Sequence, residues 1–135
     1  MSAATLERPT LRSAASHDLD LVLEHVSPGE AVFSTTSPRV HQHRGSAPEA
    51  GPCRTLLDFA LSAAVQSLLT SDQSYRPVEL VMTPVHAPVP GEGRLEASAR
   101  VVRSGCGLLV ATGAVRGPRG ISVTGRLVAL ASLRT

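Results

Sequence analysis

The first apolar and polar pattern in the chain predicts a pair of strands. Leucines recur at every second position from Leu19 to Leu23, which is the period of a half-buried strand. Ser27-Pro28-Gly29-Glu30 is a strong turn sequence, and β-branched residues resume in the segment from Ala31 to Ser37. The pattern therefore predicts a β-hairpin over residues 18–37.

The longest apolar stretch, from Pro52 to Thr70, predicts a helix. Good helix formers follow Pro52, and neither glycine nor proline interrupts them. Apolar residues cover nearly the whole circumference, with one continuous stripe made of Leu57, Ala60, Leu61, Ala64 and Leu68. Such a helix is expected to be buried. Asp58 is the only ionisable residue between Thr55 and Ser71, and a buried carboxylate is costly unless it is paired or functional.

Four more strands are predicted after the helix, with turns between them. They cover residues 78–85, 95–101, 108–115 and 121–133. One helix combined with strands in meander spacing is typical of an α+β domain. We therefore expect a single α+β domain over residues 18–135, preceded by a flexible leader over residues 1–17.

Composition narrows the range of functions. The chain has 135 residues and a net charge of +2, which is too weak to indicate nucleic-acid binding. All 13 basic residues are arginine, so lysine chemistry is excluded. Cys53 and Cys106 form no C-x-x-C pair and are expected to be free thiols. With no signal peptide or membrane span in the sequence, we expect a cytoplasmic protein that binds neither membranes nor nucleic acid.

Two motifs carry a resemblance to a known family. Glu49-Ala50-Gly51 is followed by Leu56-Leu57-Asp58, and a Pro-x-x-Gly sequence at Pro88 precedes the long alternating strand that starts at Leu95. This arrangement resembles the hotdog-fold acyl-CoA thioesterases, specifically the PaaI-like and 4-hydroxybenzoyl-CoA thioesterase group, over residues 18–133. In that family His-Gly-Gly stands where Glu49-Ala50-Gly51 stands here. The resemblance implies a hotdog fold, in which an antiparallel meander sheet wraps a long central helix.

The resemblance also implies roles for individual residues. Asp58 falls on the catalytic carboxylate of the family, and Ser62, one turn later, falls where a hydroxyl orients water or the carboxylate. His43 falls on the loop position that contacts the thioester carbonyl. The backbone N–H groups of Ala50 and Gly51 fall on the start of the helix, which binds the oxyanion.

Several alternatives stay open for these residues. Asp58 is either the nucleophile or a general base, or else a structural partner of Arg54 or Ser62 at helical spacing. His43 belongs to a His-x-His pair, but no further ligand completes a metal site, so no metal is expected. Cys53 is interpreted as a packing residue. Ser62 is either functional or a packing serine.

The chemistry predicts an oligomer. Ala50 and Asp58 are eight positions apart, roughly 12 Å along a helix, so they cannot flank one carbonyl. If both act, each active site takes residues from two subunits, which predicts a homodimer or a dimer of dimers. Arg103 and Arg119, both near turns, are candidates for binding the phosphates of coenzyme A. Coenzyme A would be part of the substrate, and no other cofactor is expected.

The leading functional hypothesis is hydrolysis of an acyl-CoA or acyl-carrier thioester. One alternative is a hotdog dehydratase, which would pair a loop histidine with the acid of the helix. Another is a non-catalytic module that binds an acyl thioester, because Glu49 and Ala50 replace the first two residues of His-Gly-Gly. The sequence does not identify the acyl group.

Overall fold

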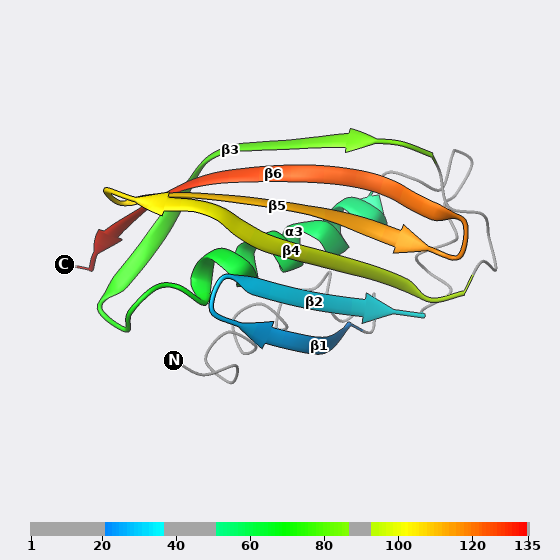
Figure 1. Cartoon of the computed structure of the whole chain (residues 1–135), viewed down its shortest axis with the longest axis horizontal. Helices are drawn as coiled ribbons and strands as arrows, with labels where there is room; N and C mark the ends of the chain where they lie inside the picture. The colour runs from blue at the N-terminus through cyan, green and yellow to red at the C-terminus, as the bar shows by residue number, and fades with distance from the viewer. Residues whose placement is uncertain (1–20, 37–50, 87–92, 135) are drawn as a thin grey trace.

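The computed structural model describes residues 21–36, 51–86 and 93–134. One helix and six strands are present in these ranges (Figure 1). They are β1 (Val22–Ser27), β2 (Glu30–Thr35), α3 (Gly51–Gln66), β3 (Gln73–Pro84), β4 (Leu95–Gly105), β5 (Leu108–Gly117) and β6 (Gly120–Leu133). The predicted leader, residues 1–17, lies outside the described residues.

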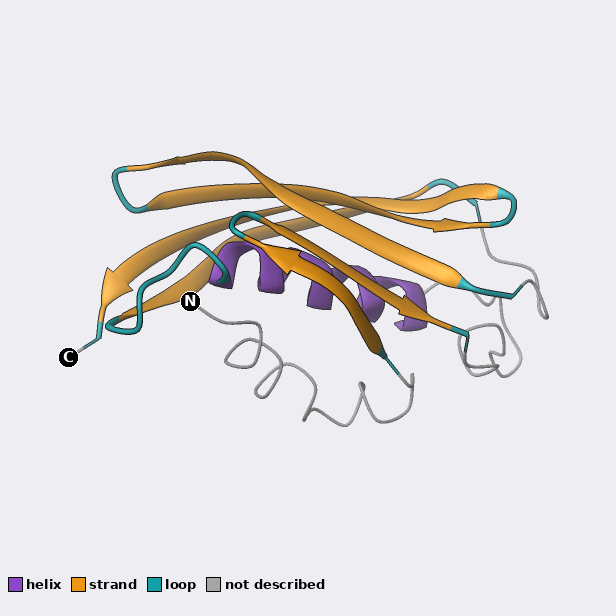
Figure 2. Cartoon of the chain, turned by 60° about the horizontal axis from the view of Figure 1, so that its bottom comes forward, coloured by secondary structure: helices purple, strands orange, loops and turns teal. Residues whose placement is uncertain are grey.

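The six strands form one antiparallel sheet in the order β1-β2-β4-β5-β6-β3. Strands β4, β5 and β6 follow one another as a meander at its centre, while β1 and β3 are the two edges. The sheet curves around α3 and covers one side of it (Figure 2). The predicted α+β architecture, with one central helix and an antiparallel sheet, is confirmed.

The core lies between α3 and the inner face of the sheet. Alternate residues of β4 are buried there, while the residues between them are partly or fully exposed. The largest buried side chains come from both layers: Phe33, Leu56, Leu57, Leu61, Val65, Leu95, Val115 and Leu127. Phe33 of β2 also meets Phe59 of the helix, with ring centroids 6.3 Å apart. Four of the five residues of the predicted apolar stripe are buried against the sheet, namely Leu57, Ala60, Leu61 and Ala64. The fifth, Leu68, lies beyond the end of the helix and is exposed.

The helix ends four residues before the predicted boundary. The Leu68 N–H bonds to the Val65 carbonyl and the Leu69 N–H to the Gln66 carbonyl, which are the tighter bonds of a last helical turn. The Ser67 hydroxyl donates to the Ala64 carbonyl at 2.7 Å and accepts the Gly29 N–H at 2.7 Å. This buried serine ends the helix and ties it to the β1–β2 turn.

Strand β3 begins at Gln73, five residues before the predicted start at Val78. Proline usually argues against a central strand, but β3 lies at the edge of the sheet, where a missing N–H is tolerated. The register between β3 and β6 shifts between Pro77 and Glu79, so the extra residue is absorbed as a bulge. No helix in the described part of the chain combines the length and apolar character needed to cross a membrane.

Candidate active site

Helix α3 has one face that the sheet leaves open. Leu56 and Leu57 are fully buried, whereas Arg54 and Asp58 are exposed and Ser62 is partly exposed. Residues four apart on a helix share a face, so these three polar residues form one line along it. Most apolar residues of the helix are buried, as expected, but in a single subunit the face that carries Arg54 and Asp58 is exposed, because one curved sheet covers only one side of the helix.

Within the described residues Asp58 has one side-chain hydrogen-bond partner, Ser62, one helical turn further on. The Ser62 hydroxyl donates to Asp58 Oδ1 at 3.3 Å. Although Asp58 is exposed as a residue, the protein around it removes enough water from its carboxyl group to raise its pKa. The hydrogen bond from Ser62 lowers the pKa and offsets part of this rise. The result is a carboxylate that accepts a proton more readily than an ordinary aspartate.

Of the two structural partners considered for Asp58, Ser62 is observed and Arg54 is not. Arg54 lies one turn before Asp58 on the same exposed face. In the part of the chain that the structure describes, no salt bridge joins the two side chains. The Asp58 carboxylate therefore has no cationic partner there that would explain it as a structural residue.

The start of α3 and Asp58 are separate sites within one subunit. Gly51 is the first helical residue, and the first N–H groups of an α-helix have no carbonyl partner within the helix. Asp58 follows seven positions later, about 10 Å further along the axis. His43, Glu49 and Ala50 lie outside the described residues. The described geometry thus agrees with the sequence argument that a single helix does not place both groups around one carbonyl.

The two candidate phosphate ligands do not lie together. Arg103 pairs with Val110 near the beginning of β5, whereas Arg119 lies in the turn after β5 ends at Gly117. The seven-residue offset along the strand corresponds to about 23 Å. Figure 1 shows the β5–β6 turn at the end of the molecule where α3 starts, and the β4–β5 turn at the other end. Of the two arginines, only Arg119 therefore lies in a turn at the end of the molecule where the helix starts.

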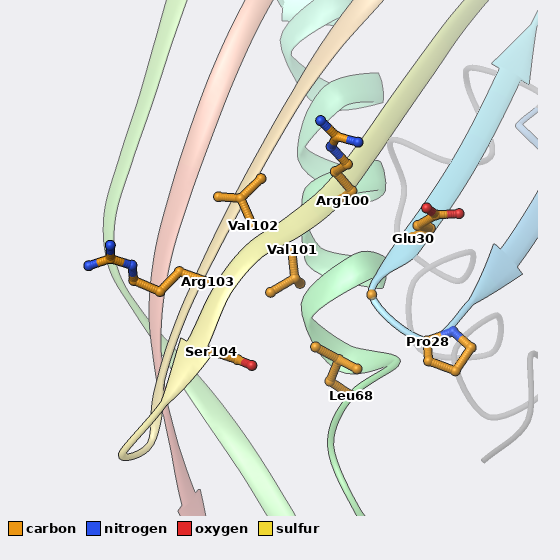
Figure 3. Close-up of a pocket in the computed structure, with 9 residues that line it drawn as sticks. Pro28, Glu30, Leu68, Arg100, Val101, Val102, Arg103 and Ser104 are labelled. Atoms are coloured by element: carbon orange, nitrogen blue, oxygen red, sulfur yellow. The ribbon is translucent and has the colours of Figure 1, made fainter.

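Arg103 instead belongs to a hollow that the sequence did not indicate (Figure 3). Its volume is about 590 Å³, and it is lined by Pro28, Gly29, Glu30, Leu68, Arg100, Val101, Val102, Arg103 and Ser104. It forms because β2 stops pairing at Arg100 while β4 continues to Gly105. Leu68 is ten positions beyond Asp58, so this hollow is distinct from the Asp58 face within one subunit.

Histidine, cysteine and acidic side chains are spread over the described ranges. No group of three or more histidine, cysteine, aspartate or glutamate side chains gathers there in a way that could hold a metal ion. Cys53 is buried and Cys106 exposed, and both are free of disulfides, as predicted. The burial of Cys53 agrees with its interpretation as a packing residue.

Strand β3 carries a second feature that sequence reasoning missed. Three large apolar side chains of β3, and a fourth that directly follows the strand, are more than two-fifths exposed. They are Val78, Leu80, Val81 and Val85. One edge of β3 pairs with β6, and no strand within the described residues pairs with its other edge. An apolar, unpaired edge of this length is a surface on which another chain can pair.

Comparisons with known proteins identify the fold. No protein-family model and no curated protein matches the sequence. Among solved structures, a thioesterase family protein from Silicibacter pomeroyi superposes with a TM-score of 0.80 and 21% identity, over 98% of this chain and 99% of that one. The chain has the hotdog fold. The resemblance to hotdog-fold thioesterases that the sequence motifs suggested is thereby confirmed for the fold.

Two further hotdog structures are similar over most of their length. The Escherichia coli PaaI protein has a TM-score of 0.77 and 17% identity, covering 92% of this chain and 88% of that one. A hypothetical thioesterase protein from Streptococcus pneumoniae, solved with coenzyme A, has a TM-score of 0.73 and 15% identity over 88% and 92%. At these identities the likeness concerns the fold, and the roles of residues in this hotdog domain rest on its own geometry.

Proposed function

We propose that this hotdog domain hydrolyses an acyl-CoA or acyl-carrier thioester to the free acid and the thiol. The observation that carries the proposal is Asp58, an exposed carboxylate in the middle of the central helix. It accepts a hydrogen bond from Ser62, has a raised pKa and has no salt bridge within the described residues. The names of its structural neighbours, which include several thioesterases, support the same reaction.

The reaction requires a base or nucleophile and a site for the oxyanion. As a base, Asp58 takes a proton from water, and the resulting hydroxide forms the new C–O bond as the C–S bond breaks. As a nucleophile, its oxygen displaces the thiolate to give an anhydride, which water then hydrolyses. In the first route the departing thiolate takes the proton held by Asp58, and in the second route it takes a proton from the water that hydrolyses the anhydride. The backbone N–H groups at Ala50 and Gly51, at the start of a helix, would stabilise the oxyanion.

Two subunits would supply the two halves of each site. Because Gly51 and Asp58 are about 10 Å apart along one helix, the oxyanion donors must come from a second copy if both act on one carbonyl. The free edge of β3, with its exposed apolar side chains, is the surface through which two sheets would join. We therefore propose a homodimer, alone or as half of a dimer of dimers, with the loop residue His43 contacting the carbonyl.

An assay that follows thiol release tests this proposal against its alternatives. The purified protein is offered a panel of acyl-CoA thioesters and acyl-carrier thioesters, and free thiol is measured against time. A hydrolase releases thiol from at least one member. A dehydratase converts a β-hydroxyacyl or enoyl thioester without releasing thiol, and a binding module binds a thioester without converting it. Either of these results would contradict the proposal.

Replacing Ser62 by alanine is expected to shift the pH dependence of hydrolysis. The Ser62 hydroxyl lowers the pKa of Asp58, so its loss raises that pKa further. Asp58 must be ionised to act, and the acid limb of kcat/KM should therefore move to higher pH, with activity at alkaline pH retained. The measurement is a pH–rate profile of wild type and Ser62→Ala. An unchanged acid limb would separate Ser62 from the reacting carboxylate.

The position of the substrate phosphates gives a paired prediction. Arg119 lies at the end of the sheet where α3 starts, so Arg119→Ala should raise KM for acyl-CoA roughly tenfold with little change in kcat, as expected for lost ground-state binding. Arg103→Ala is the matched control at the opposite end. The measurement is the steady-state KM for acyl-CoA of both variants. A larger rise in KM for Arg103→Ala than for Arg119→Ala would indicate that the phosphates bind at the hollow instead.

A further inference from the structure

Two glycines face each other in the middle of the sheet. Gly113 of β5 pairs directly with Gly125 of β6. Neither has a backbone conformation that requires glycine, since the positive φ angles of the described glycines occur elsewhere. A Cβ atom at Gly113 would lie 3.1 Å from Leu57 Cδ1, and one at Gly125 would lie 2.8 Å from Leu57 Cδ2. Because Gly113 and Gly125 have no side chains, they leave a recess in the sheet that Leu57 fills. We call this recess the glycine socket.

The socket is closed on its other sides. A Cβ at Gly113 would also lie 2.5 Å from the Ser98 carbonyl oxygen, and one at Gly125 would lie 3.4 Å from Leu61 Cδ1. Leu57 itself is fully buried. Because protein interiors are packed as tightly as organic crystals, a helix held in this way cannot approach, withdraw or rotate without displacing Leu57.

Leu57 immediately precedes Asp58 in α3. Successive residues of an α-helix are rotated by about 100°, so a helix that points Leu57 into the sheet points Asp58 toward the open face. We propose that the glycine socket positions Asp58, with Leu57 as the positioning residue that fixes the height and rotation of the helix. The inference rests on the proposed function, in which Asp58 is the reacting carboxylate.

Displacement of a reacting group by about 1 Å can cost about a hundredfold in rate. Gly125→Ala introduces a methyl group 2.8 Å from Leu57 Cδ2 and 3.4 Å from both Leu61 Cδ1 and the Val81 carbonyl oxygen. Because both leucines belong to α3 and are fully buried, we expect the methyl group to be accommodated by a shift of Leu57 together with the helix. We expect kcat to fall about tenfold or more with KM changed less than about twofold. In the double variant, Leu57→Val removes one carbon from the socket and so compensates for the methyl group that Gly125→Ala adds. The double variant should therefore recover a kcat within about threefold of wild type.

A glycine elsewhere provides the control for this test. A Cβ atom at Gly105 would meet no other atom within 4 Å, and Gly105 has no left-handed φ, so Gly105→Ala should leave kcat unchanged. Crystal structures of wild type, Gly125→Ala and the double variant report the position of Asp58 independently of activity. A displaced Asp58 with unchanged kcat, or an undisplaced Asp58 with reduced kcat, would overturn the inference.

A second pair of variants applies if Gly125→Ala does not fold. Leu56 and Leu57 are both fully buried in α3, but only Leu57 is among the atoms nearest to a Cβ at either socket glycine. Leu57→Val and Leu56→Val should lose similar stability, while only Leu57→Val lowers kcat. Equal kcat values would overturn the inference. If Asp58→Asn is fully active, the role proposed for Asp58 fails while hydrolysis itself stands, and the structures still show whether the socket sets the helix.

Discussion

Asp58→Asn is expected to lower kcat by ~10²-fold or more, which is the scale of losing a general base. Asparagine has almost the same volume and still accepts the hydrogen bond from Ser62, but it can neither take up the proton nor attack the carbonyl. Steady-state kinetics with any thioester that the wild type hydrolyses provides the measurement. Retention of more than about a third of kcat would remove Asp58 from the reaction.

The same variant should fold at least as well as wild type at neutral pH. Because the folded protein raises the pKa of Asp58, the folded state binds more protons than the unfolded chain between the ordinary and the raised value. The stability of the wild type therefore falls as pH rises through that window. The stability of Asp58→Asn should not fall in this way. Its Tm should therefore exceed that of the wild type above pH ~4, near the ordinary pKa of aspartate, and the difference should vanish below that pH. A Tm loss at neutral pH would indicate a structural carboxylate.

Charging the free edge of β3 is expected to abolish both the dimer and the activity. Val78→Lys together with Val81→Lys places two cations on the edge that we propose as the interface, where like charges from two subunits would meet. We expect a monomer by sedimentation and a fall in kcat/KM of ~10²-fold or more, since each site loses its second half.

The opposite edge of the sheet supplies the control. Val22 of β1 is 52% exposed, close to the 56% of Val78. Val22→Lys should therefore leave both the oligomeric state and kcat/KM unchanged. A monomeric β3 variant with full activity would contradict the shared site, and a wild type that sediments as a monomer at micromolar concentration would contradict the dimer itself.

The sequence predicted most of the elements because their patterns are local. Alternation placed the central strands, and the apolar stripe containing Leu57 and Leu61 placed the face of the helix that packs on the sheet. The early start of β3 was missed because Pro77 reads as a break, whereas its place at the sheet edge is a property of the topology. The end of the helix was missed because Ser67, which ends it, bonds to Gly29, far away in the chain.

The candidate site was only partly predictable, for a similar reason. The motif singled out Asp58 and Ser62, and their hydrogen bond follows from helical spacing. The exposure of Asp58 could not be predicted in this way, because the sequence of a helix rich in apolar residues does not indicate which of its sides the sheet leaves uncovered. Gly113 and Gly125 carry no periodic signal, and their pairing is set by the register between β5 and β6.

Mixed dimers test the shared site most directly. Asp58→Asn removes the carboxylate, and Ala50→Pro removes an N–H at the proposed oxyanion site, so each homodimer alone should be inactive. Equal mixing after dissociation gives about half mixed dimers, each with one intact site of two, and recovers about a quarter of wild-type activity. Recovery of that activity is the result we predict. No recovery, with mixed dimers shown to form, would contradict a site built from two subunits.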